Sequence, residues 1–404
     1  MRVATSQIYS LGADAIGRAQ TELLATQQRI STGQRMLSPA DDPVGSAQAI
    51  VTTQSKSRVE RFADNITAAD EQLSFTESIL GDVTSALTDL HTLAVGAGGG
   101  ALADADRRSI ATEIEGRLLS LVGLANSKSA DGTYLFSGFK VDAEPFALVG
   151  GTYTYMGDQG QRELAVADGR NMAVTQNGSA LFDAVPTGNG SFVTSAVAAN
   201  TGSGTIDGGS VYDASLVNGH TYQLQFTTGA GGTTYNVVDQ TLGGANVPPA
   251  NRAYAAGSTI QFDGMQVAVS GAPANGDAFG IGPSTRQSVF TTIQNLVAAL
   301  RVPGSTPPGK ATIAGGISAA LQNLTQASEA VLTTRAAVGA RLAELESLSS
   351  GNDARSLQYD AQLSQLQDLD YNRAMSDFAR QQLALEAAQK SFLSVSGLSL
   401  FKYL

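Results

Sequence analysis

Apolar residues recur at every seventh position in four separate stretches, and this spacing limits the possible folds more than any other feature of the chain. The first series is Tyr9, Ile16, Leu23, Ile30 and Leu37, and the second is Val59, Ile66, Leu73, Leu80, Leu87 and Ala94. The third is Ile317, Leu324, Val331, Val338 and Leu345, and the fourth is Tyr371, Phe378, Leu385 and Phe392. The spacing predicts long helices packed side by side as coiled coils, because such helices are marginal until their apolar rows are buried.

The middle of the chain, between about residues 141 and 283, has a different pattern. More than half of the 44 glycines fall there, and apolar residues alternate with polar ones, as in "HTYQLQF". Asp263-Gly264 separates two alternating runs, which predicts a hairpin, because both central residues of such a turn need positive φ angles. We therefore expect a β domain inserted between helical segments.

These patterns predict an α+β protein, in which both ends of the chain form a discontinuous coiled-coil bundle of long helices around an inserted mainly-β domain. At 404 residues the chain is long enough for two or three domains with proper cores. We expect a terminal coiled-coil domain from residues 1–42 and 363–404 and a helical bundle domain from residues 43–140 and 285–362. Residues 141–284 would form the inserted β domain.

The segment "LSLFKYL" at residues 398–404 is strongly apolar for a chain end, where ordered packing is uncommon. We expect neighbouring subunits to bury it, together with the apolar rows of the two terminal helices. The expected subunit-interface residues are Tyr9, Ile16, Leu23, Ile30, Leu37, Tyr371, Phe378, Leu385, Phe392, Val395, Leu398, Leu400, Phe401 and Leu404.

A short acidic stretch, "LSPADDPVGSAQAI", lies between the first and second expected helices. Asp42 is placed to cap the second helix, with Pro43 at its first position. The favoured interpretation of Asp41-Asp42 is therefore a turn followed by a helix cap. A carboxylate pair for metal binding or acid–base chemistry is the alternative, although no partner ligand is near in the sequence.

Residues that commonly carry catalysis or bind metals are sparse. The chain has no Cys and two His, and we interpret both His91 and His220 as structural. No nucleophile elbow or P-loop is present. A pair of catalytic carboxylates of the glycosidase type is kept as an alternative, because such a pair has no fixed sequence spacing. The formal net charge of −11 argues against nucleic acids and anionic membranes as partners. We expect no enzyme activity and no cofactor.

Motifs at both ends of the chain resemble the flagellin superfamily. They are "QRISTGQRMLSPADDPVGSAQAI" at residues 28–50, "VGARLAELES" at residues 338–347, and "DLDYNRAMSDFARQQLALEAAQKSFLSVSGLSLFKYL" at residues 368–404. The resemblance covers both helical zones, and matching motifs in order at both ends are more specific than one motif alone.

Three further stretches are similar to the hook-associated branch of that superfamily. They are the opening "MRVATSQIY", "ANSKSADGTYLFSGFK" at residues 125–140, and the "DFARQQLALEAAQKSFLSVS" portion of the last motif. The hairpin "IQFDGMQVAVSGAPANGDAF" at residues 260–279 also resembles repeats in the inserted domains of hook-associated proteins.

The resemblance implies a structural role, as an adaptor ring that joins a hook-side junction protein to the flagellin filament. The implied partners are copies of the chain itself, the hook-side junction protein, flagellin, and a cytoplasmic export chaperone that holds the C-terminal helix. The implied location is the bacterial flagellum, outside the cell, after flagellar type III export without a cleaved signal peptide.

Three alternatives remain beside this interpretation. Filament flagellin itself would differ mainly in the number of copies. A flagellin-like scaffold carrying a zinc-protease insert lacks support, because no His-Glu-x-x-His motif is present. An unrelated coiled-coil adhesin or phage protein would leave the motifs at both ends unexplained.

Overall fold

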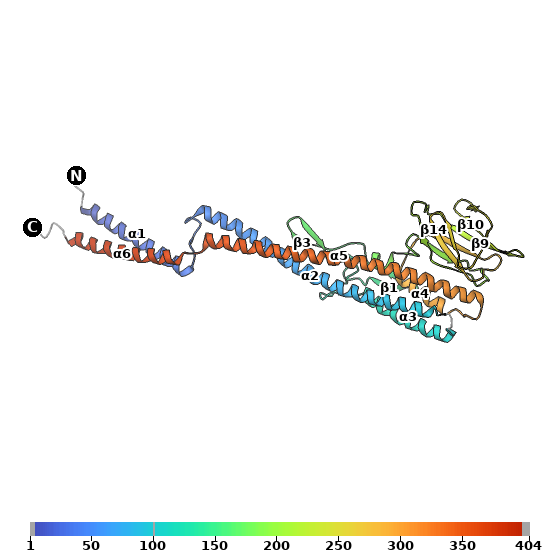
Figure 1. Cartoon of the computed structure of the whole chain (residues 1–404). Coiled ribbons are helices and arrows are strands. Elements are labelled where there is room, and N and C mark those ends of the chain that lie inside the picture. The colour runs from blue at the N-terminus through green and yellow to red at the C-terminus, as the bar shows by residue number, and fades with distance from the viewer. Residues whose placement is uncertain (1–4, 100–101, 398–404) are drawn as a thin grey trace, which may run out of the picture. The chain divides into compact units, whose positions relative to one another are not determined.

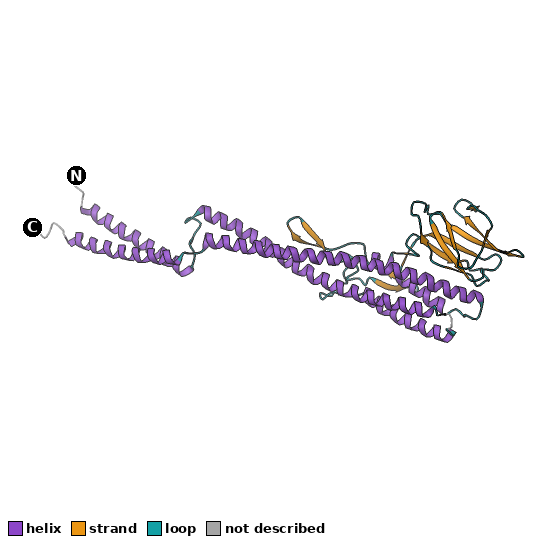
Figure 2. Ribbon diagram, in the orientation of Figure 1, coloured by secondary structure: helices purple, strands orange, loops and turns teal. Residues whose placement is uncertain are grey.

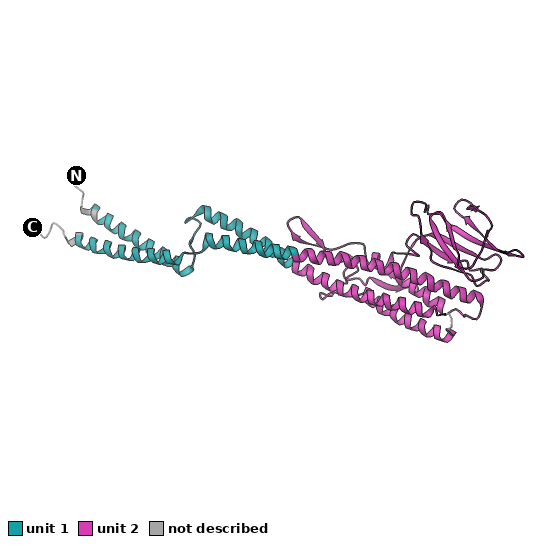
Figure 3. Cartoon of the chain, viewed as in Figure 1, with its two compact units in different colours: residues 1–65, 347–404 teal, residues 66–346 magenta. Residues whose placement is uncertain are grey.

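The computed structural model describes residues 5–99 and 102–397 and divides the chain into two compact units (Figure 3). Unit 1 combines Met1–Asn65 with Ser347–Leu404, and unit 2 is Ile66–Glu346. Both ends of the chain therefore contribute to one unit, as expected for a discontinuous bundle. The finer division into three domains stays a prediction.

Long helices come from both halves of the sequence (Figures 1 and 2). The helices are α1 (Thr5–Thr32), α2 (Pro43–Ala97), α3 (Asp104–Ala125), α4 (Val289–Leu300), α5 (Pro307–Gln367) and α6 (Tyr371–Gly397). The strands all fall between α3 and α4 in sequence and pair antiparallel. The predicted fold class, α+β with long helices at both ends and an inserted sheet domain, is confirmed.

Helices α2 and α5 contact each other in each unit: Lys56 pairs with Asp360 in unit 1, and Glu77 pairs with Arg335 in unit 2. In unit 2 their apolar rows are closed: Leu73 and Leu80 on α2 and Leu324 on α5 have no exposed surface. Burial of this kind stabilises by ~1.5–3 kcal/mol for each large side chain. The second and third seven-residue series thus form the core of this helix pair.

The two shorter helices of unit 2 pack against each other. Arg301, which follows α4, forms a 2.7 Å ion pair with Glu115 of α3. The hydroxyl of Ser288 caps α4 by accepting a hydrogen bond from the N–H of Phe290 at 3.2 Å. Burial of Phe290 then fixes the beginning of α4 against the segments that precede it.

Three small two-stranded sheets lie in the parts of the chain that connect the helices with the sheet domain. They are β1 (Phe146–Val149) with β2 (Thr152–Tyr155), β3 (Glu163–Ala167) with β4 (Arg170–Ala173), and β5 (Val185–Pro186) with β16 (Arg286–Gln287). The rings of Phe146 and Phe182 lie 5.1 Å and 5.9 Å from the ring of Phe290 on α4. The part of the expected β domain around Phe146 and Phe182 therefore packs against α4 rather than into the core of the sheet domain.

The sheet domain proper contains two larger antiparallel sheets. Its strands are β6 (Phe192–Ala196), β7 (Thr205–Ile206), β8 (Ser210–Val211), β9 (Tyr222–Gly229), β10 (Gly232–Asp239), β11 (Ala245–Asn246), β12 (Arg252–Ala253), β13 (Thr259–Phe262), β14 (Met265–Ser270) and β15 (Ala278–Pro283). One sheet has the order β11-β10-β9-β15-β6 with β12 on β10, and the other has β13-β14-β7 with β8 on β14. Inward side chains of both sheets form one apolar cluster.

The predicted hairpin is present as β13 and β14, whose register pairs Phe262 with Met265. Asp263 and Gly264 between them have φ angles of 41° and 77°. A Cβ on Gly264 would lie 2.2 Å from the carbonyl oxygen of Asp213, so this position needs glycine for space as well as for conformation. The hairpin prediction is confirmed.

The chain enters and leaves the sheet domain at one place. Strands β5 and β16 pair there, and the N–H of Thr187 donates to the carbonyl of Thr285 at 2.9 Å. The hydroxyl of Thr187 also accepts a hydrogen bond from the N–H of Thr285 at 3.0 Å. Hydrogen bonds of the backbone and of the Thr187 hydroxyl therefore hold the two crossings of the chain together.

Candidate assembly site: the terminal helix pair and its joint

The terminal helices α1 and α6 form an antiparallel pair. At one end, the rings of Tyr9 and Phe392 meet edge to face with centroids 6.0 Å apart. A Cβ built on Gly12 would lie 2.6 Å from the Phe392 ring, so the small residue makes the room that the ring fills. The first and fourth seven-residue series therefore contact each other within one chain.

The burial of this pair is incomplete. Ile16, Leu23, Ile30, Phe378 and Leu385 are half-buried. Among the side chains that the structure describes on α1 and α6, the buried ones are Thr26 and Ala374. A two-helix pair covers one strip of each helix, so these apolar rows retain exposed surface.

The remaining expected interface residues differ in their surroundings. Tyr9, Leu37 and Phe392 are half-buried, while Tyr371 is exposed by 53%. Val395 belongs to α6, but its side chain is not among those that the structure describes. Leu398, Leu400, Phe401 and Leu404 lie outside the described residues, so their part in an interface stays a prediction.

Sequence reasoning overlooked a second set of apolar residues on these helices. Leu24 and Leu383 are 63% and 68% exposed, and Leu11, Met375 and Leu393 are each more than half exposed. They fall between the positions of the seven-residue series, so the periodicity gave no reason to select them. The pairs Leu23-Leu24 and Leu383–Leu385 were the available signal, because adjacent or alternate apolar residues cannot all face one partner helix.

A joint connects this helix pair to α2 and α5. Gly33 follows α1 with a φ of 69°, the usual end of a helix, and its carbonyl accepts from the N–H of Leu369 at 3.0 Å. Arg35 donates to the carbonyl of Leu366 through Nε and Nη2, at 3.1 Å and 3.0 Å. Its own N–H donates to the carbonyl of Gln367 at 2.8 Å. The two linkers of the joint are therefore clamped together.

Asp41 and Asp42 stabilise the joint by hydrogen bonding. Asp42 accepts from the N–H of Gly45 at 2.8 Å and pairs with Arg35 at 3.0 Å, and α2 begins at Pro43. Asp41 accepts from the N–H groups of residues 37 and 38. Backbone hydrogen bonds are the main reason why the pKa of each carboxyl lies below its ordinary value. The predicted turn and helix cap are confirmed.

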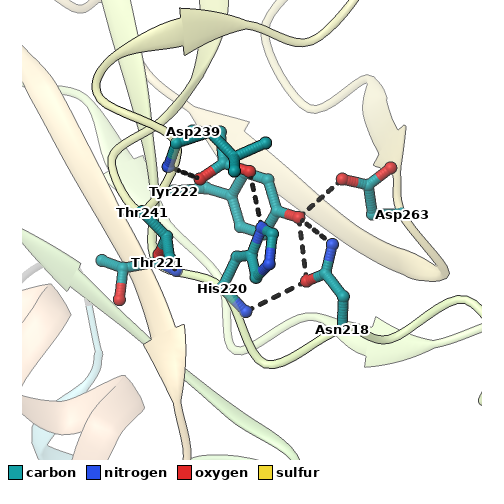
Figure 4. Close-up of polar contacts among 8 residues, drawn as sticks. Asn218, His220, Thr221, Tyr222, Asp239, Thr241 and Asp263 are labelled. Carbon is teal, nitrogen blue, oxygen red and sulfur yellow. Dashed lines mark hydrogen bonds and ion pairs between the residues drawn. The ribbon is translucent and has the colours of Figure 1, made fainter.

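The acidic and histidine residues of the sheet domain also have structural partners (Figure 4). His220 Nδ1 lies 2.7 Å from Asp239 Oδ2, and the hydroxyl of Tyr222 donates to Asp263 at 2.6 Å and bonds with Asn218. Burial raises the pKa of Asp239, but hydrogen bonds from His220 and the backbone lower it more, so it lies below its ordinary value. Burial raises the pKa of Tyr222. The network joins the loop before β9, strands β9 and β10, and the β13–β14 turn.

No group of three or more His, Cys, Asp or Glu that could hold a metal ion occurs within residues 5–99 and 102–397. Within the same ranges, no helix is both long and apolar enough to cross a membrane.

Asp277 is a buried carboxylate of the sheet domain. It is 2% exposed and accepts hydrogen bonds from the N–H groups of Thr201, Gly202 and Ala274. Its carboxylate therefore organises a turn.

Two family models match parts of the chain. The bacterial flagellin N-terminal helical region matches residues 3–140, which include α1, α2 and α3. The D2-like domain of flagellar hook-associated protein 1 matches residues 195–283, which fall within the sheet domain.

Relatives match across most of the chain. Flagellar hook-associated protein 3 of Escherichia coli strain K12 is 27% identical over 403 residues, covering 100% of this chain and 99% of that protein. The crystal structure of Xanthomonas campestris FlgL is 33% identical with a TM-score of 0.71, over 78% of this chain and 99% of that one. The crystal structure of the flagellar junction protein FlgL from Legionella pneumophila is 32% identical with a TM-score of 0.72. The match covers 80% of this chain and 100% of that one. The chain therefore belongs to the family of flagellar hook-associated protein 3, the FlgL proteins.

Proposed function

We propose that this protein is a structural subunit of the bacterial flagellum that forms an adaptor ring between a hook-side junction protein and the flagellin filament. Family membership supports the flagellar role, and the half-exposed apolar rows of α1 and α6 carry the proposal of assembly. No large apolar side chain that the structure describes on these helices is fully buried. A subunit whose terminal helices remain half-covered gains stability when neighbours cover them.

The division of the chain suggests how the two units contribute. The core of the sheet domain in unit 2 is closed within one chain, since Tyr222, Leu224 and Phe279 have no exposed surface. The side chains that the structure describes on α1 and α6 of unit 1 form no comparable core. We infer that unit 1 provides the contacts that build the ring and that the sheet domain contributes little to them.

Copies of the chain, the hook-side junction protein and flagellin are the proposed partners. Export would proceed through the flagellar type III channel without a cleaved signal peptide, with a cytoplasmic chaperone on the C-terminal helix beforehand. Exposed Leu383 and Leu393 on α6 would suit that chaperone, because an apolar helix needs cover before assembly. We propose no catalytic activity.

Immunogold labelling of intact flagella tests the proposal. We expect label confined to the boundary between hook and filament, and loss of filaments in a strain that lacks the protein. Label along the whole filament would instead support the alternative of filament flagellin, which shares the N-terminal helical match.

A strain carrying Leu385→Ala together with Phe392→Ala separates assembly from export. We expect the variant in the culture medium but no filaments, because two half-buried contacts are lost from every copy. Retention inside the cell would assign these residues to the chaperone contact, and normal motility would contradict the proposed interface.

A further inference from the structure

One polar side chain interrupts the row of buried residues on helix α5. Val331, Val338 and Leu345 are spaced by seven residues and at most 1% exposed. The next position in the row is Asn352, which is 2% exposed. From residue 347 to residue 367 it is the one buried side chain of the helix.

The side-chain amide of Asn352 is enclosed. Its Nδ2 has no hydrogen-bond partner among the residues that the structure describes. Burial of an N–H group without a partner costs stability, and a polar residue in the apolar row of a coiled coil weakens the pairing there. Helix α5 is therefore held less firmly at this point than along the row before it.

The neighbouring sequence lowers stability at the same place. Residues 347–353 read "SLSSGND", and Ser, Gly, Asn and Asp are all poorer helix formers than Ala or Leu. A Cβ on Gly351 would meet nothing within 4 Å, so packing does not require glycine there. Poor helix propensity and an unsatisfied amide are independent observations, and both fall within one stretch of seven residues.

We propose that the segment 347–353 is a compliant point of α5, where the helix opens and bends more readily than on either side. Ion pairs flank it, Arg335 with Glu77 before it and Asp360 with Lys56 after it, and these confine the opening. Such a point lets the helix adapt to a neighbour without disrupting the buried row that precedes it. The inference goes beyond the proposed function and does not depend on it.

Hydrogen exchange on the full-length chain tests the proposal first. We expect amides of residues 347–353 to exchange at least about tenfold faster than those of residues 331–345 and 356–362. Gly351→Ala and Asn352→Leu should each slow exchange in the segment. The matched control is Gly339→Ala, on the same helix and equally free of contacts, which should leave the segment unchanged.

Exchange that is uniform along α5, or fast through all residues after 353, would overturn the proposal. Uniformly slow exchange would mean that the Asn352 amide is satisfied in solution, for instance by a buried water molecule.

Spin-label distances give an independent measurement of bending. The chain has no Cys, so pairs of introduced cysteines are labelled cleanly. The pair Ala343 and Leu357 spans the segment, and the pair Glu329 and Ala343 has the same separation along the preceding part of the helix; all three residues are exposed. We expect a broader distribution of distances for the pair Ala343 and Leu357 than for the pair Glu329 and Ala343. Gly351→Ala should narrow the distribution of the first pair. Equal widths would contradict a compliant point.

Discussion

At the scale of single residues, the carboxylates of the joint make the terminal part of the chain sensitive to acid. Their pKa values are lowered, so their stabilising contribution is complete above the ordinary value of 3.8 and is lost as the pH falls below it. We expect the amides of residues 33–46 to be less protected from hydrogen exchange at pH 3 than at pH 7, once the rates are corrected for the intrinsic pH dependence of exchange. Asp42→Asn keeps the helix-capping ability but removes the charge, so it should reduce this pH dependence.

The comparison variant Asp14→Asn changes an exposed carboxylate on α1 and should leave the acid response of the joint unchanged. If the joint stays equally protected at pH 3 and pH 7, its carboxylates do not hold it.

A second residue-scale prediction concerns the hydroxyl of Tyr222, which donates to Asp263 at 2.6 Å inside the sheet domain. Tyr222→Phe removes this hydrogen bond to a charged group and leaves Asn218 without one partner. We expect a loss of about 1.5–3 kcal/mol in the unfolding free energy of the sheet domain, measured by urea denaturation of the full chain. Tyr212→Phe, at a residue 48% exposed, should change it by less than about 0.5 kcal/mol.

At the scale of elements, the contact of Gly12 with Phe392 decides whether α1 and α6 can pair closely. Gly12→Ala places a methyl group 2.6 Å from the ring and should weaken the pairing, seen as faster hydrogen exchange in α6. Gly17→Ala is the matched control, because its Cβ meets nothing within 4 Å, and it should stabilise α1 by about 0.5–1 kcal/mol. If both substitutions stabilise the helix pair, the ring of Phe392 has room to move and its contact with Gly12 does not limit how closely α1 and α6 pack.

At the scale of the whole molecule, the neck formed by β5 and β16 shows where the sheet domain can be removed. Replacing residues 189–283 with a short Gly/Ser linker keeps the Thr187–Thr285 contacts, and we expect export and filament growth to persist. Replacing residues 145–280 also removes Phe146 and Phe182 from their contacts with α4, and this variant should fail.

Motility and filament length in the two deletion strains check this prediction. Loss of filaments in both strains would show that the sheet domain contributes to assembly, whereas filaments in both would show that the aromatic contacts on α4 are dispensable.

The amino-acid sequence by itself determined the helix–sheet–helix order, the hairpin at Asp263-Gly264 and the cap at Asp42. These features are local: they follow from apolar spacing, positive φ angles or hydrogen bonds between residues close in the chain. Spacing also identified the apolar rows, since a seven-residue period places them on one face of a helix wherever that helix lies.

Tertiary structure alone decided which partner each apolar row contacts and how completely that row is buried. Leu73 and Leu324 belong to the same kind of series as Leu23 and Leu385, yet the first two are fully buried and the second two remain half-exposed. Periodicity specifies a face, but burial depends on how many elements cover it. For the same reason the unsatisfied amide of Asn352 and the clamp of Arg35 on the carbonyl of Leu366 emerge only in three dimensions, because they depend on atoms that distant parts of the chain bring together.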